Sequence, residues 1–256
     1  MADGTYVYCV VAYARRPRVS RRTRGLPGTG PVRLLDVDRG LYLAVADAPL
    51  NRYGEAAINR ELTNLEWVSR AAVAHEAVVE SFAGATAVLP MKLFTIFSSD
   101  ARAVAHVRGE RKRIDTLVRH VARHDEWSVR LRLDRTRAER VAARASSSGD
   151  VRTGVAYLAR KKARRDADLE LAERAHETVA RVYDRFATHA RQARRRSAGE
   201  LPMADGPLLL DAAFLVPRSR TASFRALAAR EARALARQGY GLTLNGPWPP
   251  YSFVQD

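Results

Sequence analysis

The chain has 256 residues, of which 46% are hydrophobic and 28% are charged. That composition supplies a buried core and excludes disorder over the whole length, and no apolar run reaches the roughly 20 residues that cross a bilayer. Lysine and arginine number 44 against 28 acidic residues, and the net charge of +16 favours acidic partners. One cysteine, Cys9, excludes an internal disulfide, and the N-terminus has no signal-peptide pattern, so we expect a cytoplasmic protein.

The first half of the chain alternates predicted strands and helices. Residues 5–13 are rich in β-branched and aromatic side chains and are typical of a strand, whereas residues 15–31 lack periodicity and predict a basic loop. Residues 32–37 and 41–46 predict a hairpin, because Gly40 in the turn between them can adopt a positive φ.

A helix is predicted over residues 61–82, where apolar side chains recur at steps of three and four. Extended structure follows over 86–97, interrupted by Pro90, and Ser99 or Asp100 is a suitable N-cap for the next helix. The apolar face predicted for the first helix consists of Leu62, Leu65, Val68, Ala72, His75, Val79 and Phe82.

The second half shows the order strand, long helix, strand, helix, strand, which is most of a split β-α-β layout. A short strand within 197–203 would complete it. The fold class is therefore α+β, and the end of a helix near Asp125 divides the chain into an N-terminal domain, 1–125, and a C-terminal domain, 126–256. The elements of the second half are predicted at 126–134, 155–194, 208–216, 219–237 and 241–244. The helix at 219–237 is amphipathic, and its inner face is predicted to consist of Phe224, Leu227, Ala228 and Leu235.

The sequence carries no motif for catalysis, a cofactor or a metal. The glycine-rich segment 25–30 lacks the lysine and the following helix of a phosphate-binding loop. His120 and His124 stand four residues apart on a predicted helix, but zinc needs further ligands, so exposed side chains at a helix end are expected. Cys9 lies within a predicted strand and is expected to be buried. We therefore expect no enzyme activity and no cofactor; an enzyme whose site has no sequence motif would instead show a deep pocket with perturbed titratable groups.

A basic run lies in the predicted long helix and lacks the interleaved aromatic residues that stack on bases. Asp166, Asp168 and Glu170 follow it, so a solvated helix face is expected, with an acidic protein partner as the alternative. A nucleic-acid-binding function of this basic protein is a further alternative, which salt-dependent affinity for any duplex would reveal. The candidate partner-binding residues of the run are Arg160, Lys161, Lys162, Arg164 and Arg165.

The C-terminal segment is rich in proline and aromatic residues. Pro249 and Pro250 stiffen the backbone, while Trp248 and Tyr251 offer large amphipathic surfaces of the kind that dominate interfaces. These four residues are the second candidate for partner binding. The other interpretation is that Trp248 folds back into the groove between the two domains, because a terminal segment stays ordered only if something holds it.

Three segments, taken in order, resemble the GvpL/GvpF family of gas vesicle proteins: VLPMKLFTIF at 88–97, AYLARKK at 156–162 and LTLNGPWPPYSF at 242–253. The resemblance covers essentially the whole chain. It implies an N-terminal α+β domain followed by a modified ferredoxin-like domain with a long helix. It also implies a minor accessory component of gas vesicles, the protein-shelled organelles that give buoyancy. Such a protein would bind the hydrophobic major shell protein GvpA and other gas vesicle proteins and assist shell assembly, with neither a membrane nor nucleic acid as an expected partner.

Members of this family often carry Gly-Thr where this chain has Phe94-Thr95. Phenylalanine adopts a positive φ far less readily than glycine. The departure therefore argues against a tight backbone turn at this point. The basic loop at 15–24 is also peculiar to this chain.

Overall fold

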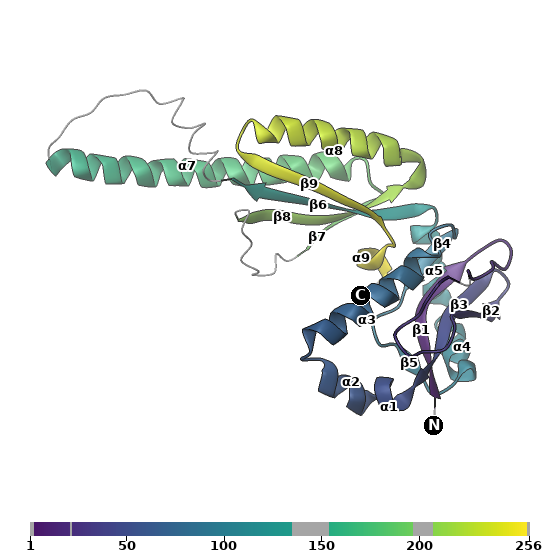
Figure 1. Ribbon diagram of the computed structural model, residues 1–256. Helices are drawn as coiled ribbons and strands as arrows, with labels where there is room; N and C mark the ends of the chain where they lie inside the picture. Colours follow the sequence, from purple (N-terminus) through teal and green to yellow (C-terminus); the bar gives the residue numbers. More distant parts are fainter. Residues whose placement is uncertain (1–2, 21, 135–153, 197–206, 255–256) are drawn as a thin grey trace. The chain divides into compact units, whose positions relative to one another are not determined.

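The computed structural model describes residues 3–20, 22–134, 154–196 and 207–254. Its contacts divide the chain into two compact units, which we call unit 1 (residues 1–125 and 248–256) and unit 2 (residues 126–247). Each unit combines a sheet with helices (Figure 1), which confirms the mixed helix and sheet class. The division into an N-terminal domain, 1–125, and a C-terminal domain, 126–256, stays a prediction.

The sheet of unit 1 is built around its first strand. The strand order is β2-β3-β1-β4, and β5 also pairs with β1. Every residue of β1 from Gly4 to Val11 is buried, as expected for a strand with both faces covered. The strands are β1 (Asp3–Ala12), β2 (Arg33–Asp38), β3 (Leu41–Pro49), β4 (Ala87–Pro90) and β5 (Ile96–Phe97).

A register shift in β1 places two neighbouring side chains in the same core. Val7 pairs with Val45 and Cys9 with Ala44, so Tyr8 is an extra residue on β1. Such a bulge changes the alternation of faces along a strand. Tyr8 and Cys9 consequently both belong to the hydrophobic cluster that packs under helix α3. The hairpin predicted at Gly40 is present, with φ of 76° at that glycine.

Two helices of unit 1, α3 and α4, begin at residues whose side chains cap them. The Ser99 hydroxyl accepts a hydrogen bond from the Arg102 N–H, at 3.3 Å, so the predicted N-cap is confirmed. The Asn64 side chain accepts from the Trp67 N–H, at 3.1 Å, and starts α3 there. The helices are α1 (Leu50–Tyr53), α2 (Glu55–Glu61), α3 (Leu65–Glu80), α4 (Asp100–Gly109) and α5 (Arg111–Val121).

The face of α3 that enters the core differs from the predicted one at the start of the helix, whereas His75, Val79 and Phe82 are buried as predicted. Leu65 is 79% exposed and Ala72 is also exposed, whereas Trp67, which was not predicted, is buried. Because the cap at Asn64 delays the helix until Leu65, the chain before it forms a turn, and the large Trp67 ring takes the core position. The buried face consists of Trp67, Ala71, His75, Val78 and Val79.

Unit 2 has the connectivity β-α-β-β-α-β that the sequence indicated. The strand order is β7-β8-β6-β9, and α7 and α8 cover the same face of this sheet (Figure 1). The long helix ends at Ala187, earlier than predicted, and the short strand follows it directly; the predicted range 197–203 lies outside the described residues. The elements are β6 (His124–Leu133), α7 (Gly154–Ala187), β7 (Gln192–Arg195), β8 (Leu208–Pro217), α8 (Thr221–Ala236) and β9 (Tyr240–Trp248).

Three phenylalanines hold the layers of unit 2 together. Phe186 of α7, Phe214 of β8 and Phe224 of α8 are fully buried, with ring centroids 5.3–5.9 Å apart. The buried Glu231 of α8 pairs with Arg185 of α7 at 2.9 Å. The inner face predicted for α8 is confirmed, because Phe224, Leu227, Ala228 and Leu235 are all buried.

We expect Phe214→Ala to lower the free energy of unfolding of unit 2 by about 4 kcal/mol, because it leaves a cavity where three elements meet. Urea unfolding can be followed by Trp127 fluorescence in a Trp67→Phe/Trp248→Phe background, since Trp127 belongs to the core of unit 2. Leu169→Ala is the control, because Leu169 is 56% exposed. A loss for Phe214→Ala no larger than that of the control would contradict the packing described here.

The buried His75 generates a pH dependence. Its Nδ1 and the Tyr6 hydroxyl lie 2.8 Å apart. Burial lowers the pKa of His75 from 6.5 to about 4, although contact with the Met91 backbone opposes the shift. The unfolded chain therefore binds this proton more readily than the folded one, so stability is full above pH 6.5 and falls as the pH drops toward 4.

From the titration of His75 alone, we expect the free energy of unfolding of unit 1 to fall by about 2 kcal/mol between about pH 7 and about pH 5. His75→Gln should remove that part of the loss, whereas His106→Gln, at an exposed position, should not. Amide hydrogen exchange of β1 peptides at the two pH values measures it. Equal pH dependence in the wild type and His75→Gln would show that His75 is not the titrating group.

Candidate functional site

The predicted basic run lies in the first half of α7. Lys162 and Arg165 are exposed, as a solvated helix face requires. The side chains of Arg160, Lys161 and Arg164 lie outside the described residues. Binding of a partner at this run stays a prediction.

The predicted tail packs on unit 1 through residues other than its tryptophan. Pro250, Phe253 and Val254 are buried, and the short helix α9 (Tyr251–Val254) contacts β4. Trp248 is 39% exposed. The segment therefore divides into an anchored end and an exposed ring, and Trp248 is the member of the predicted set that is accessible to a partner.

Tyr251 joins the tail to helix α3. Its ring packs against the core of unit 1, and its hydroxyl is buried near Glu76 without a hydrogen bond of ordinary geometry. Burial raises the pKa of Tyr251, and the Glu76 carboxylate raises it further. An open pocket of about 260 Å³ beside it is lined by Ala72, His75, Glu76, Met91, Lys92, Leu93 and Tyr251.

Unit 1 has an apolar pocket that was not predicted. It is open, has a volume of about 410 Å³, and collects side chains from α1, α2, β5 and the turn before β5. A pocket with mostly apolar walls and few polar groups is the usual form of a binding site for an apolar group. Its walls are formed by Leu50, Tyr53, Ile58, Phe94, Ile96 and Phe97, with Gly54, Glu55, Asn59 and Ser98 completing the lining.

Phe94 forms one wall of this apolar pocket from a strained backbone conformation. Its φ is 64°, and the Thr95 N–H donates to the Lys92 carbonyl at 3.2 Å, so the tight turn that the sequence argued against is present. A bulky residue at positive φ costs on the order of 1–2 kcal/mol. Two contacts offset that cost: the ring stacks on Trp67 at 5.0 Å, and the Phe94 N–H donates to the Tyr6 hydroxyl at 3.2 Å.

The described residues form no candidate metal centre. No group of three or more His, Cys, Asp or Glu is placed to hold a metal ion there. His120 and His124 do not lie on one helix, because α5 ends at Val121 and His124 belongs to β6, and both are half-buried where exposed side chains were predicted. Cys9 is buried as predicted, and burial raises the pKa of its thiol.

Among the described residues no helix is long and apolar enough to cross a membrane.

The anchoring of the tail can be tested by comparing its two aromatic ends. We expect Phe253→Ala to destabilise the docked tail by about 3 kcal/mol, since Phe253 is 3% exposed, and Trp248→Ala to cost less than about 0.5 kcal/mol. Faster amide exchange in β4 and α3 for Phe253→Ala alone would report the undocking. Equal effects of the two substitutions would contradict this division of the tail.

The family model for gas vesicle synthesis protein GvpL/GvpF matches residues 4–255. Gas vesicle protein L of Streptomyces sp. (strain CB03234) is 30% identical, over 97% of this chain and 92% of that protein. Gas vesicle protein F of the same strain is also 30% identical, over 98% of this chain and 99% of that protein.

Solved structures show the same fold. The crystal structure of GvpF from Anabaena sp. PCC7120 has a TM-score of 0.67 at 18% identity and covers 99% of this chain and 97% of that one. GvpF from Microcystis aeruginosa has a TM-score of 0.63 at 15% identity, covering 98% and 99%. With the family match over nearly its whole length, the chain belongs to the GvpL/GvpF family of gas vesicle synthesis proteins.

Proposed function

We propose that this protein is a minor accessory component of gas vesicles that binds the major shell protein GvpA and assists nucleation and assembly of the shell. Membership of the GvpL/GvpF family supports the gas vesicle context. The observation that carries the binding role is the open apolar pocket of unit 1, of about 410 Å³.

The chemistry of that pocket suits an apolar protein segment. Tyr53, Phe94 and Phe97 present aromatic surface, and Leu50 is 37% exposed at the same pocket. A shell protein that exposes apolar surface before assembly would aggregate unless that surface is covered. Transient burial of such a segment against these side chains would keep the shell protein available for addition to the growing shell.

The charge around the pocket supports the same kind of partner. Among the described residues, Glu55 is the single charged residue that lines the pocket, whereas the whole chain has a net charge of +16. A phosphate backbone is bound by clustered Lys and Arg, and this region lacks such a cluster. The apolar pocket therefore favours a hydrophobic protein over a nucleic acid.

Leu50→Glu places a carboxylate at the apolar pocket, so we expect it to weaken binding of the shell protein by at least about tenfold. The assay follows light scattering after dilution of denatured GvpA into the full chain, which should suppress the scattering in low salt and in about 0.5 M salt alike. Leu169→Glu is the matched control, because it changes an exposed leucine of unit 2.

Two results would contradict the proposal. In the first, the wild-type chain leaves the aggregation of GvpA unchanged. In the second, the chain no longer suppresses aggregation of GvpA in about 0.5 M salt, but it binds duplex DNA at low salt. That result would favour the nucleic-acid-binding alternative. If Leu50→Glu and Leu169→Glu weaken the suppression of aggregation equally, the pocket is not the binding site for GvpA.

A further inference from the structure

Helix α3 carries a second apolar face that unit 1 leaves uncovered. Leu65 and Val73 are 79% and 70% exposed and lie eight residues apart, so both project from the side of α3 away from the core. Ala72 and Ser69 lie between them and are exposed. Leu65 and Ala72 were predicted to be core, but they are exposed and Trp67 is buried instead. Leu65, Val73 and two more of the described exposed large hydrophobics, Leu50 and Leu62, belong to helices α1–α3 and their connections.

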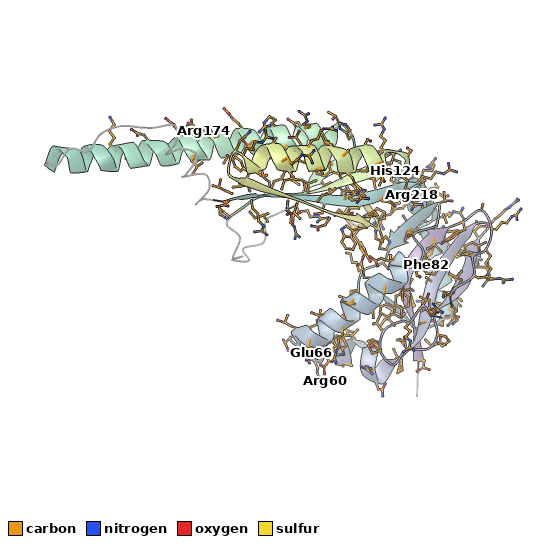
Figure 2. All side chains as sticks on the ribbon, turned by 45° about the horizontal axis from the view of Figure 1, so that its top comes forward. Arg60, Glu66, Phe82, His124, Arg174 and Arg218 are labelled. Atoms are coloured by element: carbon orange, nitrogen blue, oxygen red, sulfur yellow. The ribbon has the colours of Figure 1, made fainter. Side chains whose placement is uncertain are left out.

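The charges beside this apolar face are acidic. Glu66 and Glu80 are exposed at the two ends of α3, and Glu66 is labelled in Figure 2 near the start of the helix. Glu66 makes a 3.5 Å contact with Arg70 on the surface, which leaves the carboxylate 80% exposed. The outward face of α3 is thus apolar and negative in a chain whose net charge is +16.

The outer face of helix α8 in unit 2 carries the opposite charge. Its outer face carries Arg225, Arg230 and Arg233 around exposed Ala226 and Ala229, and the exposed Arg237 follows as the C-cap. Spacings of three and four residues place like charges side by side on a helix, an arrangement that is unfavourable by a few tenths of a kcal/mol per pair.

These arginines have no carboxylate partner among the described residues. The single acidic residue of α8, Glu231, faces inward and pairs with Arg185. A repulsive row of cations that folding leaves uncompensated is a natural surface for an acidic partner.

The two helices are complementary to each other. Both have 16 residues. Leu65 and Val73 project from α3, and Ala226 and Ala229 leave the surface of α8 low enough for such side chains to pack between the arginines. Glu66 and Glu80 then meet cations of α8. We infer that α3 of one copy of this protein binds α8 of a second copy.

A second copy fits these observations better than a polyanion does. A phosphate backbone would pair with the arginines but would leave Leu65 and Val73 exposed and the glutamates of α3 unused. Copies that each carry +16 repel one another over long range, and one helix face on each side is a small interface, so the association is weak and transient. The contact joins two different surfaces, as in head-to-tail association.

Sedimentation velocity of the full chain from about 1 to about 500 μM tests the inference, a range suited to a micromolar Kd. We expect self-association at low salt that weakens in about 0.5 M salt. Arg230→Glu/Arg233→Glu and, separately, Glu66→Arg/Glu80→Arg should each raise the dissociation constant at least about tenfold. Arg102→Glu/Lys112→Glu is the matched control, because it changes the net charge equally at exposed sites on α4 and α5.

A mixture of Arg230→Glu/Arg233→Glu with Glu66→Arg/Glu80→Arg gives the decisive test. Each variant alone brings like charges together, but in the mixture α3 of either variant meets an α8 of opposite charge, so association should return. A chain that is monomeric throughout, a mixture that fails to associate, or a control that loses association equally would overturn the inference. If self-association persists in Arg230→Glu/Arg233→Glu while its affinity for heparin falls, the α8 face binds polyanions and the inference is also wrong.

Discussion

The Tyr6 hydroxyl is the point on which the arrangement of unit 1 depends. It lies 2.8 Å from Nδ1 of His75 and accepts a hydrogen bond of 3.2 Å from the Phe94 N–H. The central strand β1 is thereby tied both to helix α3 and to the turn before β5. A buried hydroxyl with two partners in a low-dielectric core is expensive to disturb, because loss of either partner leaves a polar group unsatisfied.

The shape of the apolar pocket depends on the hydrogen bond between Phe94 and Tyr6. Phe94 can hold a left-handed conformation because its N–H is bonded to Tyr6 and its ring is stacked on Trp67. The strained turn brings Phe94 to the same pocket as Leu50 and Phe97, which belong to other elements. Strain at a residue that lines a pocket is a recurring property of binding sites. The family membership and this pocket together support a role in handling an apolar shell protein.

Helix α3 shows why a helix with two apolar faces is hard to interpret from its sequence. One face carries Leu65 and Ala72, the other carries Trp67 and Ala71, and both repeat at helical spacing. The cap at Asn64 and the size of the Trp67 ring decide which face is buried. The face left outside is the one that we assign to a second copy, opposite the arginines of α8.

The sequence by itself determined the family, the mixed fold class, the inner face of α8, the cap at Ser99 and the exposure of the basic run at Lys162 and Arg165. These depend on patterns within one element, or on segments specific enough to identify relatives. The tertiary structure alone decided the end of α7, the strained turn at Phe94, the outward face of α3 and the pocket. Each of these is fixed by side chains from distant segments, because a buried surface is chosen by the best packing among all elements and local periodicity offers more than one solution.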